Sequence, residues 1–322
     1  MPKISIILPT YNVEPYIERA LQSCINQTFK DIEIIVVDDC GNDKSIDIAK
    51  EYAKKDERIK IVHNKENLGL LRARYEGVKA NNSFYIMFLD PDDYLELNAC
   101  EECVKILDSD NNVDLICFNY YEMSIQKRDE YLFYVNAFYG NIEQFYYYLF
   151  SQYPSFSWNI FNKVFKKDIY IQTFDLLKLD IADKNTMAED FLVTLYSLAL
   201  INRIYTIKHC LYNYNTTNIN SATREKKNLQ KIQSYKNDLN FVIKKIFDLI
   251  YHVNDYYYLI VLNISIGGLN IHKIDLTYKY LTKNFLKKFA LKIKRKIVKI
   301  KMKKYTKLAK NILKEKNVSS SL

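Results

Sequence analysis

Short apolar runs alternate with segments of helical periodicity along the first 120 residues, and this alternation limits the folds open to the chain. Residues 3–8 (KISIIL) form a continuous β-rich run, as in strands that are covered on both faces. Over residues 14–27, apolar side chains recur at helical spacing. Strands are expected next at residues 31–39, 59–63, 84–90 and 113–119, with helices over residues 46–53, 70–80 and 100–107. The pattern predicts an α/β fold with a mostly parallel central sheet.

Acidic residues follow two of the expected strands. Ligands of open α/β sheets bind beyond the carboxyl ends of the strands, where this chain carries Pro9–Asn12, Asp38, Asp39 and Asp90–Asp93. The chain has six glycines and neither GxGxxG nor GxxxxGK[ST], which disfavours dinucleotide oxidoreductases and P-loop NTPases. Because carboxylates repel phosphate, a phosphorylated ligand would need a divalent metal, and Asp-x-Asp supplies hard oxygen ligands suited to Mg²⁺ or Mn²⁺. The alternative is a solvated turn in which Asp92 or Asp93 caps the next helix.

Composition and cysteine usage favour a cytosolic globular protein. The 322 residues are 48% hydrophobic and 26% charged, enough for one large domain and a smaller one. The amino-terminal residues lack the pattern of a secretory signal, and we expect no transmembrane helix because no continuous apolar run reaches 18 residues. Six cysteines fit no disulfide framework, and the Cys100–Cys103 pair has no second pair to complete a zinc site.

Five segments, in this order and spacing, resemble the inverting family 2 glycosyltransferases of GT-A fold. They are residues 5–45, 67–78 (NLGLLRARYEGV), 88–95 (FLDPDDYL), 157–167 (SWNIFNKVFKK) and 187–198 (MAEDFLVTLYSL). The resemblance is strong over residues 1–125 and fades beyond about residue 215. It implies a GT-A nucleotide-sugar transferase fold with a carboxy-terminal helical region. The expected domains are a catalytic domain at 1–215 (nucleotide half 1–125, acceptor half 126–215), a helical extension at 216–280 and a basic amphipathic tail at 281–322.

The resemblance implies a binding site for a UDP-sugar. Asp39 would accept a hydrogen bond from the uracil N3–H, and the base and ribose would be lined by Pro9, Thr10, Tyr11 and Glu14. Asp38 is expected to serve as a turn acid. Arg74 would lie near the nucleotide phosphates, with a surface position on its helix as the alternative.

The same resemblance implies a divalent metal, Mn²⁺ or Mg²⁺. Asp92 would be its direct ligand, Asp90 would reach the ribose or the metal's waters, and Asp93 would assist or cap a helix.

Sugar transfer also needs a base that takes the proton of the acceptor hydroxyl. The resemblance assigns this role to Asp190, with Glu189 contacting the acceptor or orienting Asp190. The alternative is that the two acids only favour a helix start through its dipole. Trp158 would offer a flat face to an acceptor sugar, or else belong to the core.

A narrower resemblance, strongest in the nucleotide half, is to bacterial β-1,3-galactosyltransferases that extend lipooligosaccharide. It implies UDP-galactose as donor and N-acetylgalactosamine as acceptor, although residues 120–180 and 215–322 depart from that group. The alternatives are another UDP-sugar in capsule or glycan assembly, and a noncatalytic scaffold that binds sugar nucleotides.

The carboxy-terminal segment differs sharply in charge from the rest. Residues 281–322 hold 15 Lys/Arg and one acid, a net charge of +14, so the preceding residues carry −5 of the total of +9. One helical face would carry Phe285, Phe289, Ile293, Ile297 and Ile300, with lysines around it. This pattern suits the anionic inner face of the cytoplasmic membrane, where glycolipid acceptors reside. Nucleic acid is not expected as a partner. The segment could instead form a dimer contact or remain a solvated tail.

Overall fold

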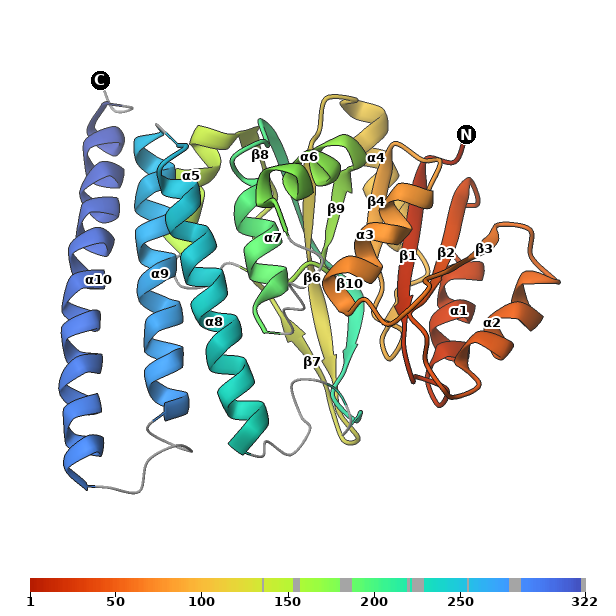
Figure 1. The fold of residues 1–322 in the computed structure, drawn as a ribbon. Helices are drawn as coiled ribbons and strands as arrows, with labels where there is room; N and C mark the ends of the chain where they lie inside the picture. The colour runs from red at the N-terminus through yellow and green to blue at the C-terminus, as the bar shows by residue number, and fades with distance from the viewer. Residues whose placement is uncertain are drawn as a thin grey trace.

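The computed structural model describes residues 1–134, 136–152, 157–179, 187–218, 221, 229–253, 255–277 and 285–319. Four parallel strands form one half of its central sheet, in the spatial order β3-β2-β1-β4 (Figure 1). They are β1 (Ile4–Thr10), β2 (Ile32–Asp38), β3 (Ile59–His63) and β4 (Tyr85–Phe88). β1 and β4 are buried throughout, as continuous apolar runs predict. The α/β fold class expected from the sequence is confirmed.

Antiparallel pairs are confined to the other half of the sheet. β9 (Lys163–Lys166) runs antiparallel between β4 and β6 (Leu115–Met123), and β10 (Arg203–Asn215) is parallel to β6. β5 (Tyr94–Leu95) pairs with β10 directly after the Asp90–Asp93 turn. Two further strands, β7 (Arg128–Tyr131) and β8 (Phe138–Asn141), extend this half. The acidic turn is therefore held by a strand more than 100 residues away in the sequence.

Helices cover both faces of the sheet. One face packs on α1 (Ile17–Ile25), α2 (Ser45–Ala53) and α4 (Ala99–Ser109), and the other on α3 (Leu70–Ala80), α6 (Lys167–Leu177) and α7 (Glu189–Ser197). α3 lies unusually close to the sheet, because a Cβ at Gly77 would lie 2.5 Å from Ile7 Cγ2 and 2.9 Å from Val37 Cγ2. This close packing fixes where the other side chains of α3 point.

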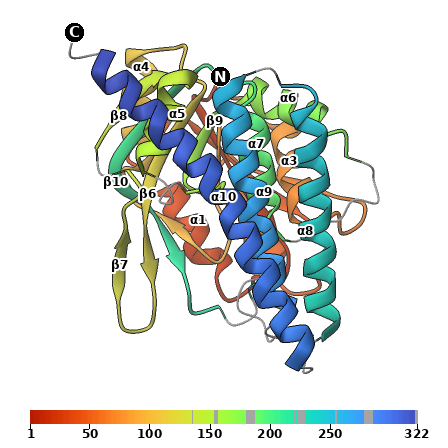
Figure 2. The same ribbon diagram turned by 90° about the vertical axis from the view of Figure 1, so that its left-hand side faces the viewer.

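The remaining helices stack beyond α7 as a further layer (Figures 1 and 2). They are α5 (Ile142–Gln152), α8 (Leu229–Ile250), α9 (Tyr256–Leu276) and α10 (Phe285–Ser319). Residues 258–276 of α9 form a helical segment that could cross a membrane, judged by length and composition only. We expected no such segment, because the sequence has no continuous apolar run of 18 residues. Half of that window is buried within the molecule, where α9 packs against α8 and α10. Residues 219–220, 222–228 and 278–280 of the expected helical extension, and residues 281–284 and 320–322 of the expected tail, lie outside the described residues.

Candidate active site

The turn after β4 is anchored by Asp93. This carboxylate is 1% exposed, and it accepts hydrogen bonds from the Tyr212 hydroxyl (2.6 Å) and the Asn215 amide (2.6 Å) of β10. Both of its oxygens thus accept hydrogen bonds from the protein. The residue at the start of α4 is Asn98, so the expectation that Asp93 caps this helix is wrong, whereas its assistance to a metal stays a prediction. Asp93 fixes the direction in which Asp90 and Asp92 project.

Asp90 and Asp92 present oxygen atoms at the carboxyl edge of the sheet. One oxygen of Asp92 accepts a hydrogen bond from the Asn218 side chain (2.8 Å), and Asp90 accepts one from Arg74 Nη2 (2.8 Å). Burial, and then the negative charge of Asp90, raise the pKa of Asp92. A divalent cation would relieve this repulsion, and the oxygen donors suit Mg²⁺ or Mn²⁺. Within the described ranges no group of three His, Cys, Asp or Glu side chains could hold a metal ion.

Arg74 joins this turn to the predicted catalytic base. The residue is 1% exposed, which rules out the alternative of a surface position. Its Nη1 donates a short hydrogen bond to Asp190 Oδ1 and lies 3.9 Å from Glu189 Oε1, while Nη2 reaches Asp90. A buried guanidinium needs such carboxylate partners. Asp90 and Asp190, which are 100 residues apart in the sequence, therefore share one cation.

Glu189 and Asp190 begin α7 and differ in their surroundings. Burial and the neighbouring Asp190 raise the pKa of Glu189 above its usual range. Partial burial also raises the pKa of Asp190, whereas the Arg74 charge opposes this shift. The Asp190 side chain remains 23% exposed. Asp190 is the more accessible member of the pair and lies beside the Arg74 guanidinium.

A buried lysine organises the segment that faces Asp190. Lys163 is 0% exposed, and its ammonium donates to Ser157 O (2.8 Å), to Asn159 O and to Asn162 Oδ1 (3.0 Å). Burial lowers the pKa of Lys163 to about 8. From the segment that it holds, the Ile160 amide donates to Asp190 Oδ2 (3.3 Å). Sequence reasoning missed Lys163, because lysines are mostly surface residues.

Trp158 lies in the same segment, and its contact with an acceptor sugar stays a prediction. Its ring is half-buried and packs against Phe191 with ring centroids 4.8 Å apart, and its carbonyl accepts a hydrogen bond from Thr194 Oγ1 (3.1 Å). The indole therefore belongs partly to the core while part of its surface remains open near Asp190.

The predicted uracil acceptor, Asp39, is 3% exposed and already has protein donors. Oδ1 accepts from the Asn64 side chain and the Leu68 amide (both 2.8 Å), and Oδ2 accepts from the Gly69 amide (3.0 Å). Gly69 has φ +79°, a conformation that favours glycine, and it begins α3. Asp39 thus fixes the start of the helix that carries Arg74. Oδ2 retains one acceptor lone pair for a ligand.

The other predicted nucleotide contacts lie around the end of β1. Pro9 and Thr10 are buried, and the Thr10 hydroxyl donates to the Leu8 carbonyl (3.0 Å). Tyr11 is 49% exposed, and Glu14 accepts a hydrogen bond from the Lys44 amide (2.9 Å). Tyr11 therefore offers the accessible ring at this edge.

The expected turn role of Asp38 is confirmed, since its carboxylate accepts from the Cys40 amide (3.0 Å) and lies 2.7 Å from His63 Nδ1. All six cysteines are free.

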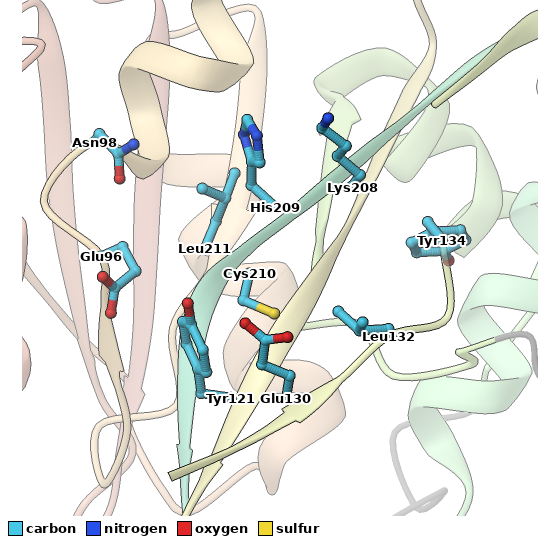
Figure 3. A pocket seen from close by; sticks show the side chains of 10 residues that line it. All are labelled: Glu96, Asn98, Tyr121, Glu130, Leu132, Tyr134, Lys208, His209, Cys210 and Leu211. Atoms are coloured by element: carbon cyan, nitrogen blue, oxygen red, sulfur yellow. The ribbon is translucent and has the colours of Figure 1, made fainter. Parts of the chain in front are cut away.

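A pocket of about 530 Å³ lies elsewhere, against β6, β7 and β10 (Figure 3). Ten residues line it: Glu96, Asn98, Tyr121, Glu130, Leu132, Tyr134, Lys208, His209, Cys210 and Leu211. None of the predicted donor, metal or base residues is among them.

Curated proteins match part of this chain in sequence. The uncharacterized glycosyltransferase EpsJ of Bacillus subtilis is 41% identical over 128 residues, 40% of this chain and 37% of that protein. The minor teichoic acid biosynthesis protein GgaB of the same organism is 41% identical over 115 residues, 35% of this chain and 13% of that protein. The chain thus spans well under half the length of these curated relatives.

Solved structures share the fold at low sequence identity. TarS of S. aureus in complex with UDP has a TM-score of 0.62 at 18% identity, over 85% of this chain and 72% of that one. The mannosyltransferase PcManGT from Pyrobaculum calidifontis, in complex with GDP-Man and Mn²⁺, has a TM-score of 0.55 at 13% identity, over 96% and 86%. The fold is thus that of the GT-A glycosyltransferases. The model of the family described as glycosyl transferase family 2 matches residues 5–173, more than half of the 322 residues, and the chain therefore belongs to that family.

Proposed function

We propose that this protein is a metal-dependent, inverting glycosyltransferase that moves a sugar from a UDP-sugar to an acceptor hydroxyl. The observation that carries the proposal is the buried Arg74, which binds both Asp90 of the acidic turn and Asp190. Because one guanidinium binds both the acidic turn and the base, a metal-bound diphosphate and an acceptor hydroxyl would lie close enough to react. A fold that only binds sugar nucleotides would not need a partly accessible base at this position.

The transfer is a single displacement. Asp190 accepts the proton of the acceptor hydroxyl as its oxygen forms a bond to the anomeric carbon. The bond from that carbon to the diphosphate oxygen breaks on the opposite side, and UDP leaves with the electron pair. Asp92 and Asp90 would hold the divalent ion, Mn²⁺ or Mg²⁺. The ion would neutralise the negative charge of the diphosphate. Glu189, beside Asp190, contacts the acceptor or helps to orient the base.

Two further observations support a UDP-sugar and a metal. TarS is described in complex with UDP and with UDP-GlcNAc, and PcManGT with a nucleotide sugar and Mn²⁺. In the present chain Asp39 keeps one acceptor lone pair for a uracil N3–H, and Tyr11 lies exposed at the edge where the base and ribose are expected.

We further propose a donor sugar and an acceptor. The resemblance of the nucleotide half favours UDP-galactose, with β-1,3 transfer to N-acetylgalactosamine of a lipooligosaccharide-type acceptor. The naming of GgaB as a teichoic acid biosynthesis protein favours the alternative, another UDP-sugar used in a different surface glycan. In both cases the enzyme would act in the cytoplasm at the inner face of the membrane, on a glycan or glycolipid.

A panel of UDP-sugars tests the proposal. The purified protein is incubated with Mn²⁺ and UDP-galactose, UDP-glucose, UDP-N-acetylgalactosamine or UDP-N-acetylglucosamine, with and without β-linked N-acetylgalactosaminides, and UDP release and glycan products are measured. We expect turnover with one sugar, lost on adding EDTA and restored by Mn²⁺ or Mg²⁺. Turnover with UDP-galactose alone would support the narrower assignment. No turnover of any UDP-sugar with any acceptor, by a folded protein, would contradict the proposed function.

A further inference from the structure

Helix α10 carries two apolar stripes, and the first of them fastens the helix to the body of the protein. Ala309 and Ile312 are buried, and Met302 and Tyr305 pack against the same core. The Met302 side chain fills the space that a Cβ at Gly267 of α9 would occupy. Nearby, Arg295 forms a bidentate ion pair with Asp275, at 2.6 and 2.9 Å. α10 is therefore a docked element of the fold.

The second stripe faces away from the protein. Ile293, Ile297 and Ile300 are 48%, 49% and 59% exposed, and their spacing of four and three residues places them on one side of the helix. At about 100° per residue this side is roughly opposite Met302 and Ala309. Figure 2 shows α10 on the outside of the molecule, lying over α9. The side chains of Phe285 and Phe289, expected on the same face, lie outside the described residues.

Exposed lysines border the outer stripe on both sides. Lys294 and Lys301 lie along one flank, and Lys296 and Lys303 along the other. Over its whole length α10 contains 14 Lys/Arg and one acid, Glu315. A partner for this surface must bury isoleucines and at the same time supply negative charge.

These two requirements select among partners. A second copy of the chain would place lysines against lysines, which costs free energy. Nucleic acid would neutralise the lysines but leave the isoleucines in water. A bilayer that contains anionic phospholipid satisfies both, because acyl chains bury the isoleucines while headgroups attract the lysines.

We propose that the outer face of α10, formed by Ile293, Ile297 and Ile300 with their flanking lysines, docks this protein on an anionic bilayer in a fixed orientation. The orientation follows from the inner stripe, which prevents α10 from acting as a free tether. The isoleucines lie in the amino-terminal half of α10, toward the edge of the molecule where β1, β2 and β4 end (Figure 1). Where the acceptor is lipid-linked, a step that rests on the proposed function, it would approach Asp190 from this side.

Vesicle co-sedimentation tests the docking with the full chain. The variant I293S/I297S/I300S is compared with the wild type and with I125S, a matched control that removes a 91% exposed isoleucine far from α10. On vesicles of phosphatidylcholine with phosphatidylglycerol, we expect the triple variant to bind at least about tenfold more weakly than the wild type and I125S. Wild-type binding should weaken as salt rises, and should be weak on phosphatidylcholine alone.

Three outcomes would overturn the docking proposal: no wild-type binding to anionic vesicles, equal binding to both vesicle types, or a triple variant that binds like the wild type. A wild-type dimer that the triple variant loses would assign the stripe to self-association instead. Because the three isoleucines are exposed, thermal unfolding should confirm that all variants are folded. Transfer to a soluble acceptor should be unchanged in the triple variant, so failure of docking and failure of the proposed enzymatic function give different results.

Discussion

At the scale of single residues, the positions of the carboxylates are explained by two buried cations. Arg74 binds Asp90 and Asp190, and Lys163 binds the segment that donates to Asp190. The acids could be found from the sequence because they follow strands or begin a helix and match a family motif. The cations could not be placed, because a lysine or arginine in a sequence does not reveal that it is fully buried. Of the two positions expected for Arg74, the surface one is wrong because the residue is buried, and the one beside the phosphates stays a prediction.

Lys163 is expected to position the base for transfer. In Lys163→Met, three oxygens of residues 157–162 lose their donor and the Ile160 amide is no longer held against Asp190. We expect kcat to fall at least about tenfold, because small displacements of a catalytic group are costly. The affinity for UDP with Mn²⁺, measured by calorimetry, should change less than about twofold, since the donor site lies on other elements.

Two comparisons separate positioning from a general loss of stability. In an Asp190→Asn background, Lys163→Met should add little further loss, because both changes act on the same group. Thr194→Val, which removes the hydrogen bond to the Trp158 carbonyl at nearly constant volume, should lower kcat in the same direction. Folded Lys163→Met protein with wild-type kcat would show that Lys163 has no part in positioning.

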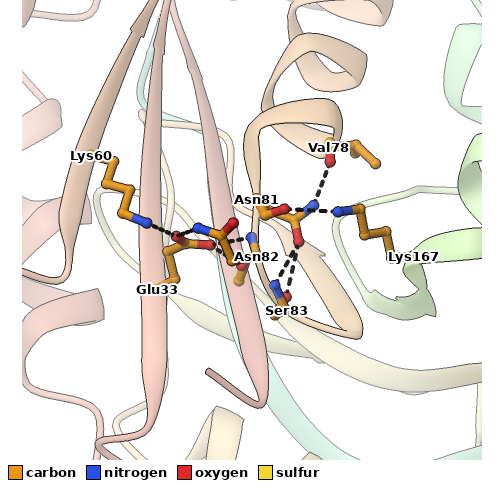
Figure 4. Close-up of polar contacts among 8 residues, drawn as sticks. Glu33, Lys60, Val78, Asn81, Asn82, Ser83 and Lys167 are labelled. Carbon is orange, nitrogen blue, oxygen red and sulfur yellow. Dashed lines mark hydrogen bonds and ion pairs between the residues drawn. The ribbon is translucent and has the colours of Figure 1, made fainter. Parts of the chain in front are cut away.

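At the scale of elements, one buried carboxylate ties together the end of the sheet opposite the site. Glu33 of β2 is 3% exposed and accepts hydrogen bonds from Ser5 of β1 (2.8 Å), from the Asn82 amide (2.9 Å) and from Lys60 of β3. Figure 4 shows Lys60 and Asn82 converging on it. Burial alone would raise the pKa of Glu33, but Lys60 and the hydrogen bonds outweigh burial and lower it.

This network predicts a stability that depends on pH. A carboxyl whose pKa is lower in the folded than in the unfolded state stabilises the fold above the unfolded pKa, and this contribution is lost as pH falls through the folded pKa. Glu33→Gln should therefore lower the free energy of unfolding by about 1–2 kcal/mol at pH 7, with a smaller difference below pH 4. Urea unfolding at both pH values measures it. If the difference in unfolding free energy between Glu33→Gln and the wild type grew in acid, the assigned pKa shift would be contradicted. The kcat of Glu33→Gln should equal that of the wild type, because Glu33 lies at the opposite end of the sheet from the site.

At the scale of the whole molecule, the sequence predicts the first half of the fold better than the second. β1 to β4 and the helices between them follow from apolar periodicity, because each βαβ unit is local in the sequence. β5, with two residues, and β9, which enters antiparallel between β4 and β6, carry no comparable local signal. Their positions depend on pairing with strands far away in the sequence, and they bring Asp93 to Tyr212 and Asn215.

The packing of α10 could also be predicted only in part from the sequence. Its lysines and the stripe of Ile293, Ile297 and Ile300 predict an amphipathic helix, and this stripe is exposed as expected. The second stripe, at Met302 and Ala309, becomes apparent only when α9 is seen to supply the matching surface at Gly267. Periodicity describes one helix at a time, whereas docking depends on two.

In the proposed mechanism Asp190 acts as the base beside a metal-bound nucleotide. The direct measurement is the rate of sugar transfer by Asp190→Asn with the preferred UDP-sugar and Mn²⁺, together with its affinity for UDP and with Asp175→Asn, an exposed acid of α6, as control. We predict that Asp190→Asn lowers the transfer rate by about 10²–10⁴-fold while UDP binds normally, and that the control keeps wild-type activity. Transfer by Asp190→Asn at the wild-type rate would contradict the mechanism.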